Sequence, residues 1–146
     1  MSHYVSAIFS NKFITIPALT WFIAQLFKLI YALVKKELAL SRLFGTGGMP
    51  SSHSCFVVSL CTVIGKTTGV ESVAFAISFA FALIVMADAA GVRQEAGKQA
   101  KLLNSLMTTH FPGEVFNEKL KELIGHKPLE VLVGAIFGFI TGIILG

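Results

Sequence analysis

Residues 13–34 read FITIPALTWFIAQLFKLIYALV, and this stretch decides the class of protein. Among its side chains only Gln25 and Lys28 are strongly polar. A helix needs about 20 apolar residues to cross the hydrocarbon core of a bilayer, which is roughly 30 Å thick. The length and composition of the segment therefore predict a membrane-spanning helix.

Three further apolar segments follow along the chain: His53–Ile64, Val70–Ala90 and Leu129–Leu145. The middle one has the length of a span. The other two are shorter, and they fit where the bilayer is thin or where their polar ends face protein. The 146 residues are 54% hydrophobic and 14% charged, with a mean hydropathy of +0.75. Because a soluble domain carries about a quarter charged residues, we predict an all-α polytopic membrane helix bundle of about four spans, forming one domain over residues 1–146.

A polar insertion separates the third apolar segment from the last. Residues 93–107 carry apolar side chains at spacings of three and four, which predicts a helix. Phe111-Pro112-Gly113 is a break, and Glu114–Ile124 is a second, shorter helix candidate. We expect this polar helical insertion to lie at the membrane surface or over the protein.

The basic residues are distributed unequally between the two membrane faces that four spans imply. The loops after the first and third spans share one face, and the other face has only Lys12 and Lys66. The cations of the richer face are Lys35, Lys36, Arg42, Arg93, Lys98, Lys101, Lys119, Lys121 and Lys127. The positive-inside rule assigns that face to the cytoplasm. We therefore expect an integral protein of the cell membrane with this face inside.

Four glycines in the last apolar segment follow one another at intervals of four residues: Gly134, Gly138, Gly142 and Gly146. This spacing places them in one stripe on a helix, where the missing side chains let another helix approach closely. Two interpretations stay open. The stripe packs against a helix of the same chain, or it forms the seam of a homodimer.

Polar residues gather in four clusters at the ends of the apolar segments. Placing ionisable groups near a membrane span costs free energy, so each cluster is expected to have a structural or functional role. The clusters are Lys35 with Arg42, Gly47–Ser54 (GGMPSSHS), Asp88–Arg93 (DAAGVR) and Gly125–Glu130 (GHKPLE). All four fall on the same expected membrane face, which indicates a functional site there.

The chemistry of these clusters suits a phosphate group. Ser51 and Ser52 begin an apolar helix after a glycine- and proline-containing turn, and the amides and dipole at a helix start bind anions. Lys35, Arg42 and Arg93 add positive charge, and arginine grips phosphate oxygens with two hydrogen bonds.

Two histidines, His53 and His126, are the obvious groups able to exchange protons near neutral pH. Pro128 fits the first position of a helix. Glu130 follows His126 by four residues, and we expect its carboxylate to hold the imidazole. Its alternative role is to cap its own helix.

Two other charged residues have structural interpretations. Asp88 is expected to pair with Arg93. Lys28 is expected to be a snorkelling side chain, with its ammonium group reaching the interface, or a support for neighbouring site residues.

The clusters resemble the motifs of the type 2 phosphatidic acid phosphatase superfamily, which also contains vanadium haloperoxidases. The whole chain is most similar to the small divergent membrane branch. The first motif of the superfamily is Lys, six residues, then Arg-Pro, and Lys35 and Arg42 have this spacing, with Leu43 in place of the proline. The second motif is Pro-Ser-Gly-His, and residues 50–53 match it with Ser52 in place of the glycine.

The third motif of the superfamily is Ser-Arg, five residues, His, three residues, then Asp. Here Arg93 follows Val92, and His126 comes only after the polar insertion, so the two halves of the motif are split. Glu130 occupies the position of the aspartate.

The resemblance implies a metal-independent phosphohydrolase of membrane lipid phosphates or diphosphates that needs no cofactor. His126 would attack phosphorus to form a phosphohistidine, Glu130 would orient its ring, and His53 would protonate the leaving alcohol. The residues implied to hold the phosphate oxygens are Lys35, Arg42, Ser51, Ser52 and Arg93.

A second class stays open, namely a noncatalytic lipid-phosphate-binding or structural membrane protein that keeps a degenerate site. The expected partners are the lipid bilayer and a lipid phosphate, and no nucleic acid. Cys55 and Cys61 have neither the spacing of metal ligands nor that of a disulfide framework, and we expect no metal.

Overall fold

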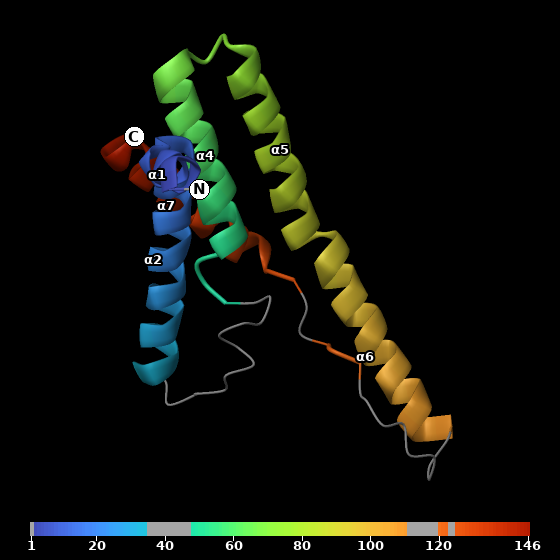
Figure 1. The fold of residues 1–146 in the computed structure, drawn as a ribbon. Coiled ribbons are helices and arrows are strands. Elements are labelled where there is room, and N and C mark those ends of the chain that lie inside the picture. The colour runs from blue at the N-terminus through green and yellow to red at the C-terminus, as the bar shows by residue number, and fades with distance from the viewer. Residues whose placement is uncertain (1, 35–47, 111–119, 123–124) are drawn as a thin grey trace.

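The structure, a computed structural model, describes residues 2–34, 48–110, 120–122 and 125–146. Its described elements are helices, which confirms the predicted all-α bundle (Figure 1). They are α1 (Ser2–Ser10), α2 (Lys12–Val34), α4 (Ser52–Thr68), α5 (Val73–Ala90), α6 (Val92–His110) and α7 (Pro128–Leu145).

The lengths of these helices agree with about four membrane spans. By length and composition, three parts of the described chain are able to cross a bilayer: Lys12–Tyr31, an apolar window within Val73–Thr109, and Pro128–Leu145. Helix α4 has 17 residues and so a length of about 25 Å, which is short of a full bilayer core. The polar start of α4 is covered by protein, since Ser51, Ser52 and Ser54 are buried there.

Helix α4 forms the centre of the bundle and packs against α2, α5 and α7. The inner face of α4 consists mainly of small side chains, which allow close helix approach. Its buried residues are Ser52, Ser54, Cys55, Val57, Ser59, Cys61 and Val63.

The glycine stripe of α7 is buried against α4 of the same chain. A Cβ atom added at Gly134 would lie 2.5 Å from the carbonyl oxygen of Ser51, and one added at Gly138 would lie 2.5 Å from that of Cys55. At Gly142 it would lie 2.7 Å from Cβ of Thr62. The possible homodimer through the Gly134/Gly138/Gly142 stripe is therefore wrong, because α4 already occupies this surface. These pairs also show that α4 and α7 run parallel.

The polar insertion begins as the helix α6, which confirms the helix expected over residues 93–107. Figure 1 shows α6 continuing from α5 away from the other helices. The second helix, expected over Glu114–Ile124, falls largely outside the described residues, and Leu120–Glu122 is not helical. The amide of Asn104 on α6 binds this short segment, since it donates to the oxygen of Leu120 (2.9 Å) and accepts from its nitrogen (3.1 Å). The chain is thereby held along α6 on its return toward α7.

Candidate active site

One end of the bundle collects the polar clusters that the structure describes. The N–H of Ser51, at the start of α4, donates to the carbonyl of Glu130 in the first turn of α7 (3.0 Å). The N–H of His126 donates to the carbonyl of Ala89 near the end of α5 (2.9 Å). The second, third and fourth clusters therefore meet, as their shared membrane face predicted. Lys35 and Arg42, the first cluster, lie outside the described residues.

The two halves of the split third motif come together through backbone contacts. Gly125 has a φ of +96°, and a Cβ atom there would lie 2.6 Å from the nitrogen of Gln94 and 2.9 Å from the carbonyl carbon of Arg93. Only glycine allows both this conformation and this approach. The loop before α7 thus lies directly on the first turn of α6, which brings His126 next to the Arg93 segment.

His126 has the largest fully buried side chain among the described residues. Its side chain is 1% exposed, and neither Nδ1 nor Nε2 has a hydrogen-bond partner in the part of the chain that the structure describes. An unpaired buried polar group costs about 1–3 kcal/mol, so its presence in a native fold calls for an explanation.

The imidazole of His126 is also uncharged at neutral pH. Burial lowers the pKa of His126 to about 4, and the positive charges of Lys28, His53 and Arg93 act in the same direction. A neutral ring keeps a lone pair on one nitrogen, which a nucleophile requires.

His53, in the first turn of α4, lies next to His126. The two ring centroids are 5.7 Å apart, and the ring planes meet at 83°, an edge-to-face arrangement. At this distance the rings are neighbours in direct contact. Both histidines singled out from the sequence are thus in one place, although no anion-sized space separates them.

Lys28 is a member of this group that sequence reasoning treated as secondary. Its side chain is 9% exposed, and its Nζ lies 3.4 Å from Oγ of Ser52. The snorkelling interpretation is wrong, because the ammonium group is buried against the start of α4. A charged residue in the middle of an apolar span was the available signal.

The serines at the start of α4 have defined contacts. Ser51 is buried and caps the helix, since its Oγ accepts hydrogen bonds from N–H (3.4 Å) and Oγ (3.0 Å) of Ser54. Ser52, also buried, faces Lys28. Both predicted phosphate-binding serines therefore lie at a helix start, where backbone amides and the helix dipole favour an anion.

Arg93 is paired as the sequence predicted. Its Nε lies 2.7 Å from Oδ2 of Asp88, and both side chains are 40% exposed. The ion pair joins the last turn of α5 to the first turn of α6 and fixes the guanidinium group near His126.

Glu130 does not hold the imidazole of His126. Its Oε2 accepts a hydrogen bond from the backbone N–H of Lys127 (3.2 Å), as in a capping box. Because α7 begins only at Pro128, His126 lies before the helix, and the carboxylate folds back over the helix start. The alternative capping role is the observed one.

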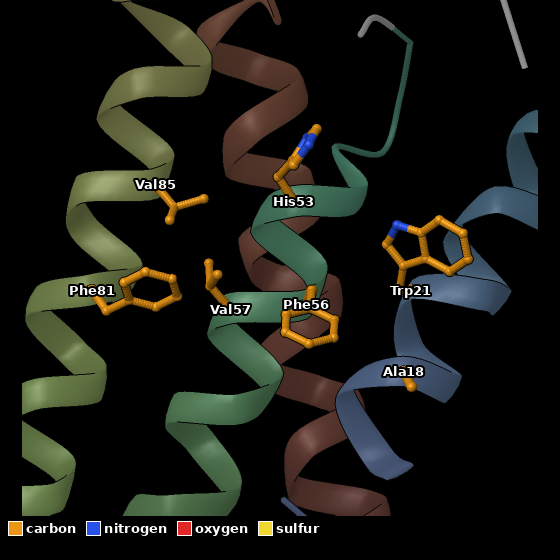
Figure 2. A pocket seen from close by; sticks show the side chains of 7 residues that line it. All are labelled: Ala18, Trp21, His53, Phe56, Val57, Phe81 and Val85. Atoms are coloured by element: carbon orange, nitrogen blue, oxygen red, sulfur yellow. The ribbon is translucent and has the colours of Figure 1, made fainter. Parts of the chain in front are cut away.

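An apolar groove leads from this end of the bundle along α4. It has a volume of about 410 Å³, and Figure 2 shows His53 at one end of it. Its lining residues are Ala18, Trp21, His53, Phe56, Val57, Phe81 and Val85. Among the described residues no three His, Cys, Asp or Glu side chains gather in the manner of a metal site.

The chain is similar to one protein family and to one bacterial membrane protein. Residues 9–141 match the family described as the Divergent PAP2 family. The chain is 41% identical over 135 residues to a protein of Bacillus subtilis (strain 168) named "Uncharacterized membrane protein YuiD", with 84% of this chain and 85% of that protein covered. No solved structure matches the chain. The chain therefore belongs to the Divergent PAP2 family.

Proposed function

We propose that this protein is a metal-independent phosphohydrolase that releases phosphate from a membrane lipid phosphate or diphosphate through a phosphohistidine. The observation that carries the proposal is the buried, unpaired imidazole of His126 in contact with His53. The ammonium group of Lys28 and the start of α4 lie beside it. An uncharged nucleophile, a second histidine and a positive environment are the parts that phosphoryl transfer needs.

The chemistry has two steps. A ring nitrogen of His126 attacks phosphorus, a P–N bond forms, and the bond from phosphorus to the lipid oxygen breaks. His53 donates a proton to that oxygen, so the lipid leaves as an alcohol or, from a diphosphate, as a monophosphate. His53 then takes a proton from water, whose oxygen attacks phosphorus, and the P–N bond breaks to release phosphate.

This geometry requires one rearrangement. In-line displacement places the nucleophile and the proton donor on opposite sides of phosphorus, whereas the rings of His53 and His126 are in contact. We infer that the phosphate group separates the two rings when it binds. Catalytic contacts often become productive only in the substrate complex.

Positive groups around the two histidines hold the phosphate oxygens in this proposal. Lys28 and Arg93 contribute charge, the α4 start at Ser51 and Ser52 contributes amides, and Lys35 and Arg42 are assigned by motif. Glu130 fixes the start of α7, so it acts on His126 through the backbone. We propose that the site faces the cytoplasm, on the charge distribution given above.

A noncatalytic lipid-phosphate binder is the second candidate. The observation that favours it is the hydrogen bond of Glu130 to Lys127, which leaves the imidazole of His126 without a carboxylate partner among the described residues.

Phosphate release separates the two candidates. The purified protein is incubated in detergent with a polyprenyl phosphate, a polyprenyl diphosphate and phosphatidate, each in the presence of EDTA, and free phosphate is measured. We expect release from at least one lipid at a rate that EDTA leaves unchanged. Binding of these lipids without release would support the noncatalytic candidate, and a loss in EDTA would contradict metal independence.

Substitution of Lys28 tests the phosphate-binding role that the sequence alone did not assign. We expect Lys28→Met to lower kcat/KM for a lipid phosphate by about ten- to a hundred-fold, since a hydrogen bond to a charged group contributes roughly 1.5–3 kcal/mol. Methionine keeps the apolar stem and removes a buried charge, so the helix content measured by circular dichroism should persist.

Lys12→Met is the matched control for this substitution. Lys12 is exposed in the first turn of the same helix, at the opposite end from Ser52. We expect its kcat/KM to equal that of the unmodified protein. Equal values for both variants would remove Lys28 from the site.

A further inference from the structure

The groove beside His53 has a floor and two separate walls. Helix α4 packs against both α2 and α5, whereas within the described chain no Cα atom of α2 lies within 8 Å of a Cα atom of α5. Phe56 and Val57 of α4 form the floor, Trp21 of α2 lies on one side, and Phe81 of α5 lies on the other (Figure 2). The groove is therefore open between two spans.

The residues that line the groove are mainly apolar, so the groove favours a hydrocarbon ligand. His53 is the only ionisable side chain among the seven lining residues. The lining positions on α2 and α5 belong to helices long and apolar enough to cross the bilayer. A volume of about 410 Å³ lies within the range of about 300–1,000 Å³ that binding pockets have.

The groove is continuous with the candidate active site through a shared residue. His53 both contacts His126 and closes one end of the groove. Val57 lies one turn further along α4, about 6 Å from His53 along the helix axis. A phosphate group bound at the two histidines therefore has its carbon substituent at the mouth of an apolar channel that runs into the membrane.

We propose that this groove binds one hydrocarbon chain of the lipid phosphate substrate, which enters sideways from the bilayer between α2 and α5. The proposal rests on the proposed function for the identity of the head group. It adds where the hydrocarbon chain of the substrate lies and which residues orient the bond that is broken. By binding the hydrocarbon chain of the lipid, the groove would position the phosphate group at the two histidines. The substrate class is therefore a lipid phosphate that resides in the membrane.

The fluorescence of Trp21 tests this proposal directly, because Trp21 is the only tryptophan of the chain and it lines the groove. The protein is placed in phosphatidylcholine vesicles containing a small fraction of a lipid phosphonate whose chain carries bromine, a quencher of tryptophan fluorescence. The phosphonate resists hydrolysis. A brominated lipid with a neutral head group at the same fraction is the reference. We expect the phosphonate to quench Trp21 more than the reference does.

Two matched substitutions test the location. Ala18→Phe fills the groove, whereas Ala80→Phe adds the same bulk to an exposed position of α5 outside the groove. We expect Ala18→Phe to remove the excess quenching and to lower turnover of a lipid phosphate by roughly ten-fold or more, since misplaced reacting atoms are costly. Ala80→Phe should leave both unchanged, and circular dichroism should give the same helix content for both variants.

Three results would overturn the proposal. Equal quenching of Trp21 by the phosphonate and by the reference lipid would mean that the groove holds ordinary lipid. Excess quenching that persists in Ala18→Phe would mean that the hydrocarbon chain of the phosphonate lies outside the groove. Protection of Trp21 from both quenchers means that a second copy of the protein covers the groove. Excess quenching without phosphate release by the unmodified protein would instead uphold the groove and reject the phosphohydrolase.

Discussion

Replacement of His126 by asparagine is expected to lower phosphate release from a lipid phosphate by about a thousand-fold or more. Asparagine is polar and similar in width, but it has no nitrogen lone pair able to attack phosphorus. The backbone N–H of residue 126 still reaches the carbonyl of Ala89, so the fold should be kept. The measurement is free phosphate from the lipid that the unmodified protein hydrolyses best.

Direct detection of the intermediate strengthens this test. The unmodified protein, stopped rapidly during turnover of a radiolabelled lipid phosphate, should carry label that is stable in alkali and labile in acid, as a phosphohistidine is. His126→Asn should carry none. His53→Asn should slow the reaction without removing the site of attachment, since His53 is assigned to proton transfer.

The matched control is His3→Asn. His3 lies in α1, which precedes the start of α2, whereas the site lies near the other end of that helix. We expect His3→Asn to keep full activity. Full activity in His126→Asn, or label that persists there, would exclude His126 as the nucleophile.

The second large effect is expected from a change inside the glycine stripe. Gly138→Leu should abolish the folded state, because a Cβ atom at this position already lies 2.5 Å from the carbonyl oxygen of Cys55. The obstacle is backbone of the central helix, which cannot turn aside as a flexible side chain does. Gly138→Ala, which adds the Cβ alone, is expected to cost about 1–3 kcal/mol, as overpacking of a core does.

Thermal unfolding followed by circular dichroism in detergent checks both substitutions. Ala80→Leu is the control, since it adds bulk to an exposed position of α5 and should leave Tm near that of the unmodified protein. If Gly138→Leu instead gave a stable monomer from a dimeric parent, α4 would not be the partner of the stripe. An unchanged Tm in Gly138→Leu would contradict the close α4–α7 packing.

Several features of the site follow from sequence alone because their causes are local. The lengths of the apolar runs predicted the helices, since the number of residues that crosses a bilayer is set by its thickness. Pro128 marked the start of α7, and the spacing of Asp88 and Arg93 predicted their ion pair. The motifs identified His53 and His126 before their contact was known.

Other features depended on which helix faces which. The sequence predicted that one face of α7 is free of side chains, but only the fold decides that α4 covers it. Lys28 had two possible environments, and the packing of α2 on α4 selected the buried one. Glu130 also had two possible roles, and the structure shows its carboxylate accepting from the backbone N–H of Lys127 as a cap.

The sequence by itself determined that this protein is an all-α membrane bundle with histidines and cations near the ends of its apolar segments. Those properties are set by composition and by spacing along one chain. Only the tertiary structure decided that His126 contacts His53, that the split third motif is joined where Gly125 lies on the Arg93 segment, that Lys28 lies beside the histidines, and that an apolar groove begins at His53. Each of these features depends on how separate helices are placed relative to one another. The periodicity of one helix predicts which of its faces is buried, but it does not predict which other helix packs against that face.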